Sequence, residues 1–299
     1  MKRVLITGIT GYIGSHLAEG LVKKGYEVYG LIRQPLHTEY INDFTDKLQL
    51  KTYTGTYSSV LNFVKEVKPD IIYHMATCYA IRHNSDQIAE MNGCNLLFGN
   101  YILEAMKECK IRNIVYLTTA FCHYNNEKYN PVNLYAATKQ AFSDIMRYYT
   151  EACEIHSLTL VLTDSYGPND KRSKILNSIK KAYKENQSIK LSSGTQIYDV
   201  LYISDIVGAL ERAADLLEQQ KENSSVYQIY NDNPLSLRET VDLLQKTNGI
   251  HIETKWGACP QAVRGINGKV RVDPPLPGWK VRVSLEEGLK KFWNDSAML

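Results

Sequence analysis

Three glycines near the start of the chain have the spacing of a dinucleotide-binding turn. Gly8, Gly11 and Gly14 follow a short apolar run and open what reads as a helix. Gly8 permits a tight turn, Gly11 lets the backbone approach phosphates, and Gly14 lets the helix pack against the strand. Free amides at the helix N-terminus would then face a pyrophosphate. By themselves the glycines are weak evidence, and an ordinary strand-turn-helix is the alternative.

A tyrosine and a lysine four residues apart lie much further along the chain. Tyr135 and Lys139 belong to an Ala- and Leu-containing stretch that favours a helix. At this spacing they share one face, where the ammonium is expected to lower the phenol pKa from ~10 toward neutrality, as a proton donor and acceptor needs. A second pair with this spacing, Tyr124 and Lys128, lies in a polar segment that favours a loop, and we interpret it as a chance match.

A hydroxyl side chain is expected beside the tyrosine. Residues 113–118 read as an apolar strand, and Thr119 follows at the end where a parallel strand meets a ligand crevice. The alternative is that Thr118 and Thr119 are β-branched residues that only pack at a strand end.

The elements that must position these residues alternate between strand and helix. Strands are expected near residues 3–7, 27–32, 71–75, 113–118, 158–163 and 226–230, and helices near residues 15–24, 92–109 and 135–152. This alternation predicts an α/β fold, a doubly wound parallel sheet with helices on both faces. After Asp164 the chain becomes rich in Gly, Pro, Asn and Lys with short elements, which indicates a smaller second part.

Taken together, the glycine turn, Thr119, and Tyr135 with Lys139 resemble the extended short-chain dehydrogenase/reductase family, in its nucleotide-sugar epimerase, dehydratase and reductase branch. Further matching segments are Tyr73 to Ala76, Asn92, Asp164 to Pro168, Asp199 to Asp205, Leu276 to Trp279 and Ser284 to Gly288. The resemblance covers nearly the whole chain. It implies a Rossmann-type dinucleotide-binding domain of residues 1–166 and 199–231, interleaved with a smaller α/β domain of residues 167–198 and 232–299 for a nucleotide sugar.

The resemblance also implies roles for single residues. Thr119, Tyr135 and Lys139 would be catalytic: Tyr135 would give its proton to the sugar C4 oxygen as hydride arrives from the nicotinamide, and Thr119 would orient that oxygen. The cofactor would contact Gly8, Thr10, Gly11, Tyr12, Ile13, Gly14, Arg33, Met75, Ala76, Asn92, Tyr135 and Lys139. The substrate would contact Thr77, Thr119, Asp164, Lys171, Arg172 and Arg264.

The diphosphate of the substrate would meet Arg264, assisted by Lys171 or Arg172. All three can instead be ordinary surface charges. Tyr198 stands where the family often has an arginine, so phosphate binding must be arranged differently here.

The end of the second strand bears on the choice of cofactor. An NAD enzyme commonly places a carboxylate there for the adenosine ribose 2′-hydroxyl, whereas this chain has Ile32 and Arg33. A guanidinium suits a 2′-phosphate, so NADP(H) is the expected cofactor, unless Arg33 is merely solvated. Residues 55–57 stand where the family often has an acidic contact to adenine, which leaves that contact open.

The residues after Thr119 narrow the reaction. Dehydratases of the family carry an Asp-Glu pair there, but this chain has Ala120 and Phe121, which disfavours dehydration. Two hydride-transfer reactions stay open, 4-epimerisation with bound nicotinamide and net reduction of a 4-keto sugar, and Arg33 favours reduction. The segment from Tyr166 to Arg172 looks most like reductases of CDP-4-keto-6-deoxyglucose, of the abequose and paratose synthase type. A non-catalytic dinucleotide-binding sensor or scaffold is a further alternative.

Cys122 and His123 follow Thr119 closely. In related enzymes that epimerise at C3 and C5 before reducing, a cysteine near this position acts as acid or base. Because the spacing here is one residue longer, we favour a structural role or a substrate contact.

His74 is expected to pack at a strand end and His16 to lie on the surface of the first helix. Neither is accompanied by other candidate metal ligands in the sequence.

Composition excludes several other classes. The net charge of +3, with Lys and Arg scattered, does not indicate nucleic acid, and no apolar run is long enough to span a membrane. The six cysteines form no CxxC, which favours reduced thiols and a cytoplasmic protein.

The resemblance implies a homodimer through helices 92–109 and 135–152. These two helices are expected to carry more apolar residues than the face turned to their own sheet can bury, which leaves some for a partner chain. The apolar residues are Leu96, Leu97, Phe98, Ile102, Phe142, Ile145 and Met146.

Overall fold

The computed structural model describes residues 1–34, 38–219 and 222–295. Its centre is a seven-stranded parallel sheet in the order β11-β6-β5-β4-β1-β2-β3. The strands are β1 (Arg3–Thr7), β2 (Glu27–Ile32), β3 (Leu48–Thr52), β4 (Ile71–His74), β5 (Asn113–Thr119), β6 (His156–Leu162) and β11 (Ser224–Ile229). The chain builds the sheet outward from β1 in one direction and then returns to build it from β4 in the other. A crevice therefore opens between β1 and β4 at their carboxyl ends.

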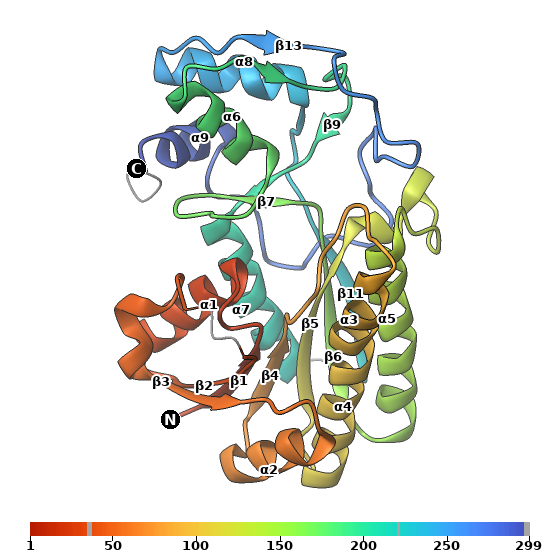
Figure 1. Cartoon of the computed structure of the whole chain (residues 1–299). Helices are drawn as coiled ribbons and strands as arrows, with labels where there is room; N and C mark the ends of the chain where they lie inside the picture. The colour runs from red at the N-terminus through yellow and green to blue at the C-terminus, as the bar shows by residue number, and fades with distance from the viewer. Residues whose placement is uncertain (35–37, 220–221, 296–299) are drawn as a thin grey trace.

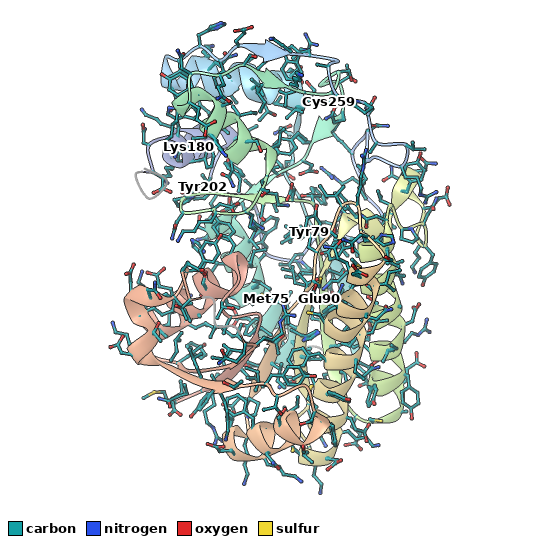
Figure 2. All side chains as sticks on the ribbon, in the orientation of Figure 1. Met75, Tyr79, Glu90, Lys180, Tyr202 and Cys259 are labelled. Carbon is teal, nitrogen blue, oxygen red and sulfur yellow. The ribbon has the colours of Figure 1, made fainter. Side chains whose placement is uncertain are left out.

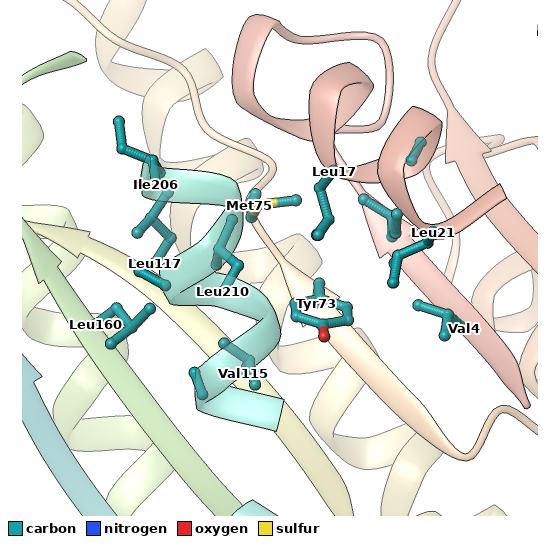
Figure 3. Close-up of a cluster of buried hydrophobic side chains, with 14 of the residues drawn as sticks. Val4, Leu17, Leu21, Tyr73, Met75, Val115, Leu117, Leu160, Ile206 and Leu210 are labelled. Carbon is teal, nitrogen blue, oxygen red and sulfur yellow. The ribbon is translucent and has the colours of Figure 1, made fainter. Parts of the chain in front are cut away.

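Helices cover both faces of the sheet, as expected for a doubly wound fold (Figure 1). They are α1 (Tyr12–Lys23) and α7 (Ile203–Gln219) on one face, and α2 (Tyr57–Val67), α4 (Phe98–Cys109) and α5 (Leu134–Ala152) on the other. On the first face, β1, β4 and β5 pack against α1 and α7 through Val4, Leu17, Tyr73, Val115 and Leu210 (Figure 3). Burial of such side chains stabilises the fold by roughly 1.5–3 kcal/mol each.

The smaller part of the chain lies beyond the carboxyl ends of the strands, in the upper half of Figure 1. Its helices are α6 (Ile175–Lys184), α8 (Leu237–Asn248) and α9 (Leu285–Trp293), which share an apolar cluster. Its strand pairs are β7 (Ser165–Tyr166) with β10 (Leu201–Tyr202), β9 (Ile197–Tyr198) with β12 (Leu235–Ser236), and β8 (Ile189–Lys190) with β13 (Thr254–Lys255). The cavity described below lies between this part and the sheet.

The expected strands are confirmed to within about two residues, and β3 is an additional strand that the periodicity did not reveal. The expected helix 92–109 begins earlier, as α3 (Asp86–Asn92), and continues into α4 through a π-helical turn, η2 (Gly93–Leu97). A π turn widens a helix by one residue and often occurs at functional sites. Short 3₁₀ turns are η1 (Asn42–Lys47), η3 (Ala120–Cys122) and η4 (Tyr124–Asn126).

The prediction that α4 and α5 carry more apolar residues than the chain's own core needs is wrong. Phe98, Ile102, Phe142 and Met146 are buried in the chain's own core, and Leu96 and Ile145 pack against that core. Only Leu97 of the seven is exposed. The helices use these residues because they approach closely at Gly99, where a Cβ would lie 2.3 Å from the Phe142 ring. These side chains therefore give no support to a dimer.

A C-terminal segment, residues 269–272, ties the loop after β5 to the sheet. The side chain of Gln228, fully buried in β11, donates to a main-chain carbonyl of this segment (2.8 Å) and accepts from one of its amides (3.2 Å). Asn126, in the loop after β5, bonds the same segment at 3.0 and 2.9 Å. These bonds hold the loop that follows Thr119.

All six cysteines are free thiols. None of the helices in the described residues is long and apolar enough to cross a membrane. Across the same described ranges, His, Cys, Asp and Glu side chains form no group of three that could hold a metal ion.

His74 is buried at the end of β4, and its neighbours determine its protonation. The hydroxyl of Thr7 accepts hydrogen bonds from the amides of Met75 and Ala76 (both 3.2 Å), so its own proton points to Nδ1 of His74 (2.9 Å). The packing role expected for His74 is thus confirmed. Burial, together with the Lys139 charge, lowers the pKa of His74 from 6.5 to about 3.

We predict that His74 makes stability depend on pH. Between about pH 6.5 and pH 3 the unfolded imidazole is protonated while the folded one is neutral, so the unfolded state binds more protons and acid destabilises the fold. The free energy of unfolding should fall by up to roughly 1.4 kcal/mol per pH unit in this window. Urea unfolding at several pH values measures the slope, and His74→Asn should flatten it. The control His251→Asn alters an exposed imidazole and should leave the slope as it is; equal slopes for all three proteins would contradict the prediction.

Candidate functional site

One cavity of about 980 Å³ lies at the carboxyl ends of the strands, beneath the smaller part of the chain. The ends of β1, β2, β4, β5 and β6 form its floor, and residues 163–165 and 172–174 line its other side. Parallel sheets bind ligands at this position because the strand ends diverge at the switch in chain direction.

The glycine turn has the geometry that a dinucleotide requires. Gly8 has φ +74°, and a Cβ there would lie 2.8 Å from the amide nitrogen of Ala76. A Cβ on Gly14 would lie 2.2 Å from the carbonyl oxygen of Gly8. The turn is therefore closed to side chains, and the first turn of α1 presents free amides to the cavity. The predicted contacts Gly8, Thr10, Gly11, Tyr12, Ile13, Gly14, Arg33, Met75 and Ala76 all line the cavity.

Tyr135 and Lys139 line the same cavity from the first turns of α5. Asn133 begins this helix, because its side chain accepts a hydrogen bond from the amide of Ala136 (2.9 Å). Lys139 is only 3 % exposed, and its Nζ lies 4.3 Å from the centre of the Tyr116 ring. The helix thus turns both side chains toward one cavity, as their four-residue spacing predicts.

Burial shifts the pKa values of this pair in opposite directions. Desolvation lowers the pKa of Lys139 to about 8. It raises the pKa of Tyr135 well above its ordinary value, with smaller contributions from Cys122 and Tyr79. The expectation that Lys139 would lower the phenol pKa is therefore wrong for the protein without ligand. Removing the phenol from water disfavours its anion, and this desolvation is the largest cause of the shift.

Thr119 ends β5 and lines the cavity, as expected. Its hydroxyl accepts a hydrogen bond from the amide of Phe121 (3.2 Å).

Cys122 is buried, donates to the carbonyl of Ala136 (3.4 Å), and is not among the cavity-lining residues. Burial raises the pKa of this thiol to about 11, so it is protonated at neutral pH. The structural role favoured for Cys122 fits this position.

His123 and the second Tyr-Lys pair also lie outside the cavity lining. Nε2 of His123 lies 3.3 Å from the Asp273 carboxylate, and its Nδ1 faces two carbonyls of the same loop. Tyr124 and Lys128 flank a turn in which Asn125 has positive φ, so they share no helix face. The interpretation of this pair as a chance match is confirmed.

Two cations on the upper side of the cavity are already paired with carboxylates. Arg172 bonds Asp170 (2.6 and 2.7 Å), and its guanidinium lies 4.3 Å from the centre of the Tyr12 ring. Lys174 bonds Asp164 (2.6 Å). Arg172 thereby joins the smaller part to α1, and both members of the Lys174–Asp164 pair line the cavity.

Tyr79 is a cavity residue that sequence reasoning missed. Its ring packs edge-on against Tyr135, with ring centres 4.9 Å apart, and Lys174 Nζ lies 5.3 Å from its centre (Figure 2). It comes from the irregular segment after β4, where no periodicity could have singled it out. Thr77, predicted as a substrate contact, lines the cavity in the same segment.

Three predicted contacts lie elsewhere. Asn92 is exposed in the middle of a continuous helix rather than at its start, Lys171 is exposed against Tyr40, and Arg264 bonds the carbonyl of Pro131 (2.9 Å). None of the three lines the cavity. The sequence pattern could not separate them from surface residues because each position depends on how its loop or helix packs.

Asn95, three residues after Asn92, is a buried asparagine of the same helix and does not line the cavity either. Its amide group bonds the amide and the carbonyl of Cys78 (2.7 and 3.0 Å) and the hydroxyl of Thr138 (2.9 Å). Counted along the helix, Asn95 shares a face with the buried residues Met91 and Phe98, which Asn92 does not. Helical periodicity taken from the true start of the helix would have found it.

The predictions for residues outside the cavity floor agree less well with the structure than those for the floor. His16 is only partly exposed, because Nδ1 bonds the carbonyl of Tyr12 (2.7 Å). Asp199, after the unexpected Tyr198, pairs with Arg271 (2.8 Å), whose guanidinium lies 3.6 Å from the Tyr230 ring centre. No spacing in the sequence distinguishes Arg271 from the other arginines.

The sequence of this chain is similar to enzymes that modify sugars. It is 26 % identical to a CDP-abequose synthase of Salmonella muenchen over 97 % of both chains, and 29 % identical to one of Yersinia pseudotuberculosis over 80 % of this chain and 82 % of that one. Among solved structures, a UDP-glucuronic acid 4-epimerase mutant of Bacillus cereus, in complex with a UDP-sugar and NAD, superposes with a TM-score of 0.84 at 20 % identity, with 98 % of each chain covered. A UDP-glucose 4-epimerase of Thermus thermophilus in complex with NAD gives the same three values.

The family model described as the NAD dependent epimerase/dehydratase family matches residues 4–231, which is most of the chain. The solved structures share the seven-stranded fold at identities that carry no more than the fold. With its glycine turn, Tyr135, Lys139 and Thr119 around one cavity, the chain belongs to the NAD dependent epimerase/dehydratase family.

Proposed function

We propose that this enzyme uses NADPH to reduce the C4 keto group of a nucleotide-linked 4-keto-6-deoxy sugar, with CDP as the nucleotide, in the synthesis of deoxysugars for surface polysaccharides. One observation carries the proposal: Thr119, Tyr135 and Lys139 face one cavity with the glycine turn, and no carboxylate follows Thr119. The names of the relatives that this chain matches over most of its length support the same sugar class.

The residues present fit a nicotinamide dinucleotide. The contacts around Gly8 and Gly14 leave a backbone cradle that any side chain would fill, and the α1 amides beside it suit a pyrophosphate. We assign Arg33 to a 2′-phosphate. When bound, NADPH supplies the hydride for the sugar carbon.

Tyr135 supplies the proton in this proposal. Because burial keeps its pKa high, the phenol is protonated at neutral pH, which is the state that a reduction needs. Thr119 orients the substrate oxygen from the end of β5. Lys139, still mostly charged at pH 7 with a pKa of about 8, stabilises the phenolate that forms after proton transfer and holds the ribose next to it.

We propose the division of labour between the two parts as well. Residues 1–166 and 199–231 hold the cofactor, and residues 167–198 and 232–299 hold the nucleotide sugar. Thr77, Asp164 and Arg172 line the cavity where the sugar would lie, and we add Lys174 to them. The six free thiols support a reducing compartment, the cytoplasm.

A 4-epimerase is the second candidate, because two solved 4-epimerases have the same fold at a TM-score of 0.84. An epimerase returns its hydride to the same sugar and consumes no NADPH. A non-catalytic dinucleotide sensor is less well supported, since a buried lysine that lines the same cavity as a half-buried tyrosine costs stability and is of use mainly in proton chemistry.

Replacement of Tyr135 tests the chemistry. Tyr135→Phe removes the proton donor and keeps the ring, so cofactor binding should survive while turnover falls by ~10²–10⁴. NADPH consumption is followed with CDP-, GDP-, UDP- and dTDP-linked 4-keto-6-deoxy sugars, and the product is identified by mass and NMR. Near-normal turnover of the variant with an accepted sugar would show that the mechanism is wrong. Interconversion of a nucleotide sugar that carries a C4 hydroxyl, without net NADPH consumption, would favour the epimerase.

Three further variants serve as comparisons for Tyr135→Phe. Thr119→Val removes an orienting hydrogen bond and should cost less turnover. Lys139→Met should impair both cofactor affinity and turnover. Tyr124→Phe is the matched control, because it makes the same change in a Tyr-Lys pair that faces no cavity, and it should have little effect.

Arg33→Ala tests the choice of cofactor. NADPH should bind the unmodified protein more tightly than NADH, because a charge-assisted contact to a phosphate is worth ~1.5–3 kcal/mol, or roughly ten- to a hundredfold in affinity. The variant should lose affinity for NADPH and keep its affinity for NADH, so that the two dissociation constants become more similar. Fluorescence titration gives the dissociation constants, and equal values for the two cofactors in the unmodified protein would refute the assignment.

We also propose a homodimer through α4 and α5, as the family resemblance implies. Since most apolar residues of these helices face inward, the contact must use exposed side chains such as Tyr148, which is 62 % exposed on α5. Light scattering at micromolar concentration should give a particle of twice the 34.1 kDa chain mass. Tyr148→Glu should weaken it, and Val263→Glu, at an exposed position outside these helices, should not. A monomer in the unmodified protein would exclude the dimer.

A further inference from the structure

The carboxylate that the second strand lacks is present at the same place from another element. Arg33 follows β2, and Glu90 belongs to α3, yet the guanidinium NH1 lies 3.7 Å from Oε1 of Glu90. Both side chains line the cavity, at the end where the β2 residues Leu31 and Ile32 also line it. A positive and a negative group therefore face the ligand together at the proposed position of the adenosine ribose.

Cys78 lies near Glu90, and the Glu90 carboxylate contributes to raising the pKa of its thiol, after desolvation by burial. Cys78 is in turn fixed through both its main-chain groups by the buried Asn95. The π turn that begins just after α3 also lines the cavity, through Gly93, Cys94 and Leu97. In Figure 2, Glu90 is labelled at the carboxyl end of the sheet, below Tyr79 in that view.

We propose that Glu90 determines cofactor specificity together with Arg33, so that the site accepts either a 2′-phosphate or a free 2′-hydroxyl. This inference rests on the proposed role of Arg33. A ribose hydroxyl would donate to the Glu90 carboxylate, in the manner in which an acidic residue after the second strand serves NAD. A 2′-phosphate would pair with Arg33, but Glu90 would compete for the guanidinium and repel the phosphate charge.

The exposure of the pair limits the size of these effects. The Arg33 and Glu90 side chains are 57 % and 55 % exposed, so water screens both the attraction and the repulsion. We therefore expect a modest preference for NADPH in the unmodified protein, with NADH as a usable second cofactor. Neither cofactor would be excluded, because each finds one partner of the pair.

The test is a double-mutant cycle on cofactor binding, which needs no sugar substrate. Dissociation constants for NADPH and for NADH are measured by fluorescence titration for the unmodified protein, Glu90→Gln, Arg33→Ala and the double variant. Glu90→Gln should tighten NADPH about threefold to tenfold and weaken NADH by a similar factor, so that the preference widens by roughly tenfold or more. In the Arg33→Ala background, the gain in NADPH affinity should shrink, because the competition for the guanidinium is gone.

A matched control is Glu154→Gln, which breaks a similar exposed pair with Arg112 (2.9 Å) outside the cavity lining and should change neither constant. If Arg33→Ala leaves NADPH binding unchanged, the assignment of Arg33 in the proposed function fails. If Arg33→Ala weakens NADPH but Glu90→Gln leaves the ratio of the two constants unchanged, or weakens both cofactors equally, the role of Glu90 is overturned and the role of Arg33 stands.

Discussion

The structure depends on a close contact between β1, the start of α1 and the end of β4 that leaves no room for side chains. A Cβ on Gly14 would lie 2.2 Å from the Gly8 carbonyl, and one on Gly8 would lie 2.8 Å from the Ala76 amide. The hydroxyl of Thr7 joins the same three elements through two amides and His74. Because the two halves of the sheet meet here, this contact determines where the crevice opens. The α1 amides point into it for the same reason.

Burial determines the protonation states of Tyr135 and Lys139, the proposed catalytic pair. Lys139 and Tyr135 are positioned by the first turns of α5, and Tyr116 lies beneath the ammonium. The same desolvation that lowers the pKa of Lys139 raises that of Tyr135, so the free protein holds a neutral phenol beside an ammonium that is close to losing its proton. Such a pair is poised to donate a proton to a substrate oxygen. The direction of these shifts is a property of the packed site and is opposite, for Tyr135, to what two residues on an isolated helix would show.

Three of the four cations that line the cavity lie beside carboxylates, and Lys139 lies over the Tyr116 ring instead. Arg172 is bound by Asp170, Lys174 by Asp164, and Arg33 lies beside Glu90. The proposed substrate and cofactor phosphates would compete with a resident carboxylate for each of these three cations. The carboxylates would then matter for specificity as much as the cations. This pairing also explains why counting basic residues along the sequence identified only part of the site.

The sequence by itself determined the fold class, the cavity floor and the Tyr135-Lys139 pair. These follow from local rules, since strand and helix periodicity, glycine spacing and a four-residue helical step are all read within a few residues. Only the tertiary structure decided the rest. Asn95 is buried and Asn92 is exposed because they lie on different faces of the packed helix, and α3 brings Glu90 within 3.7 Å of Arg33, the residue that follows β2. Such contacts join residues far apart in the chain, and burial, which sets their charge states, exists only once the elements have packed.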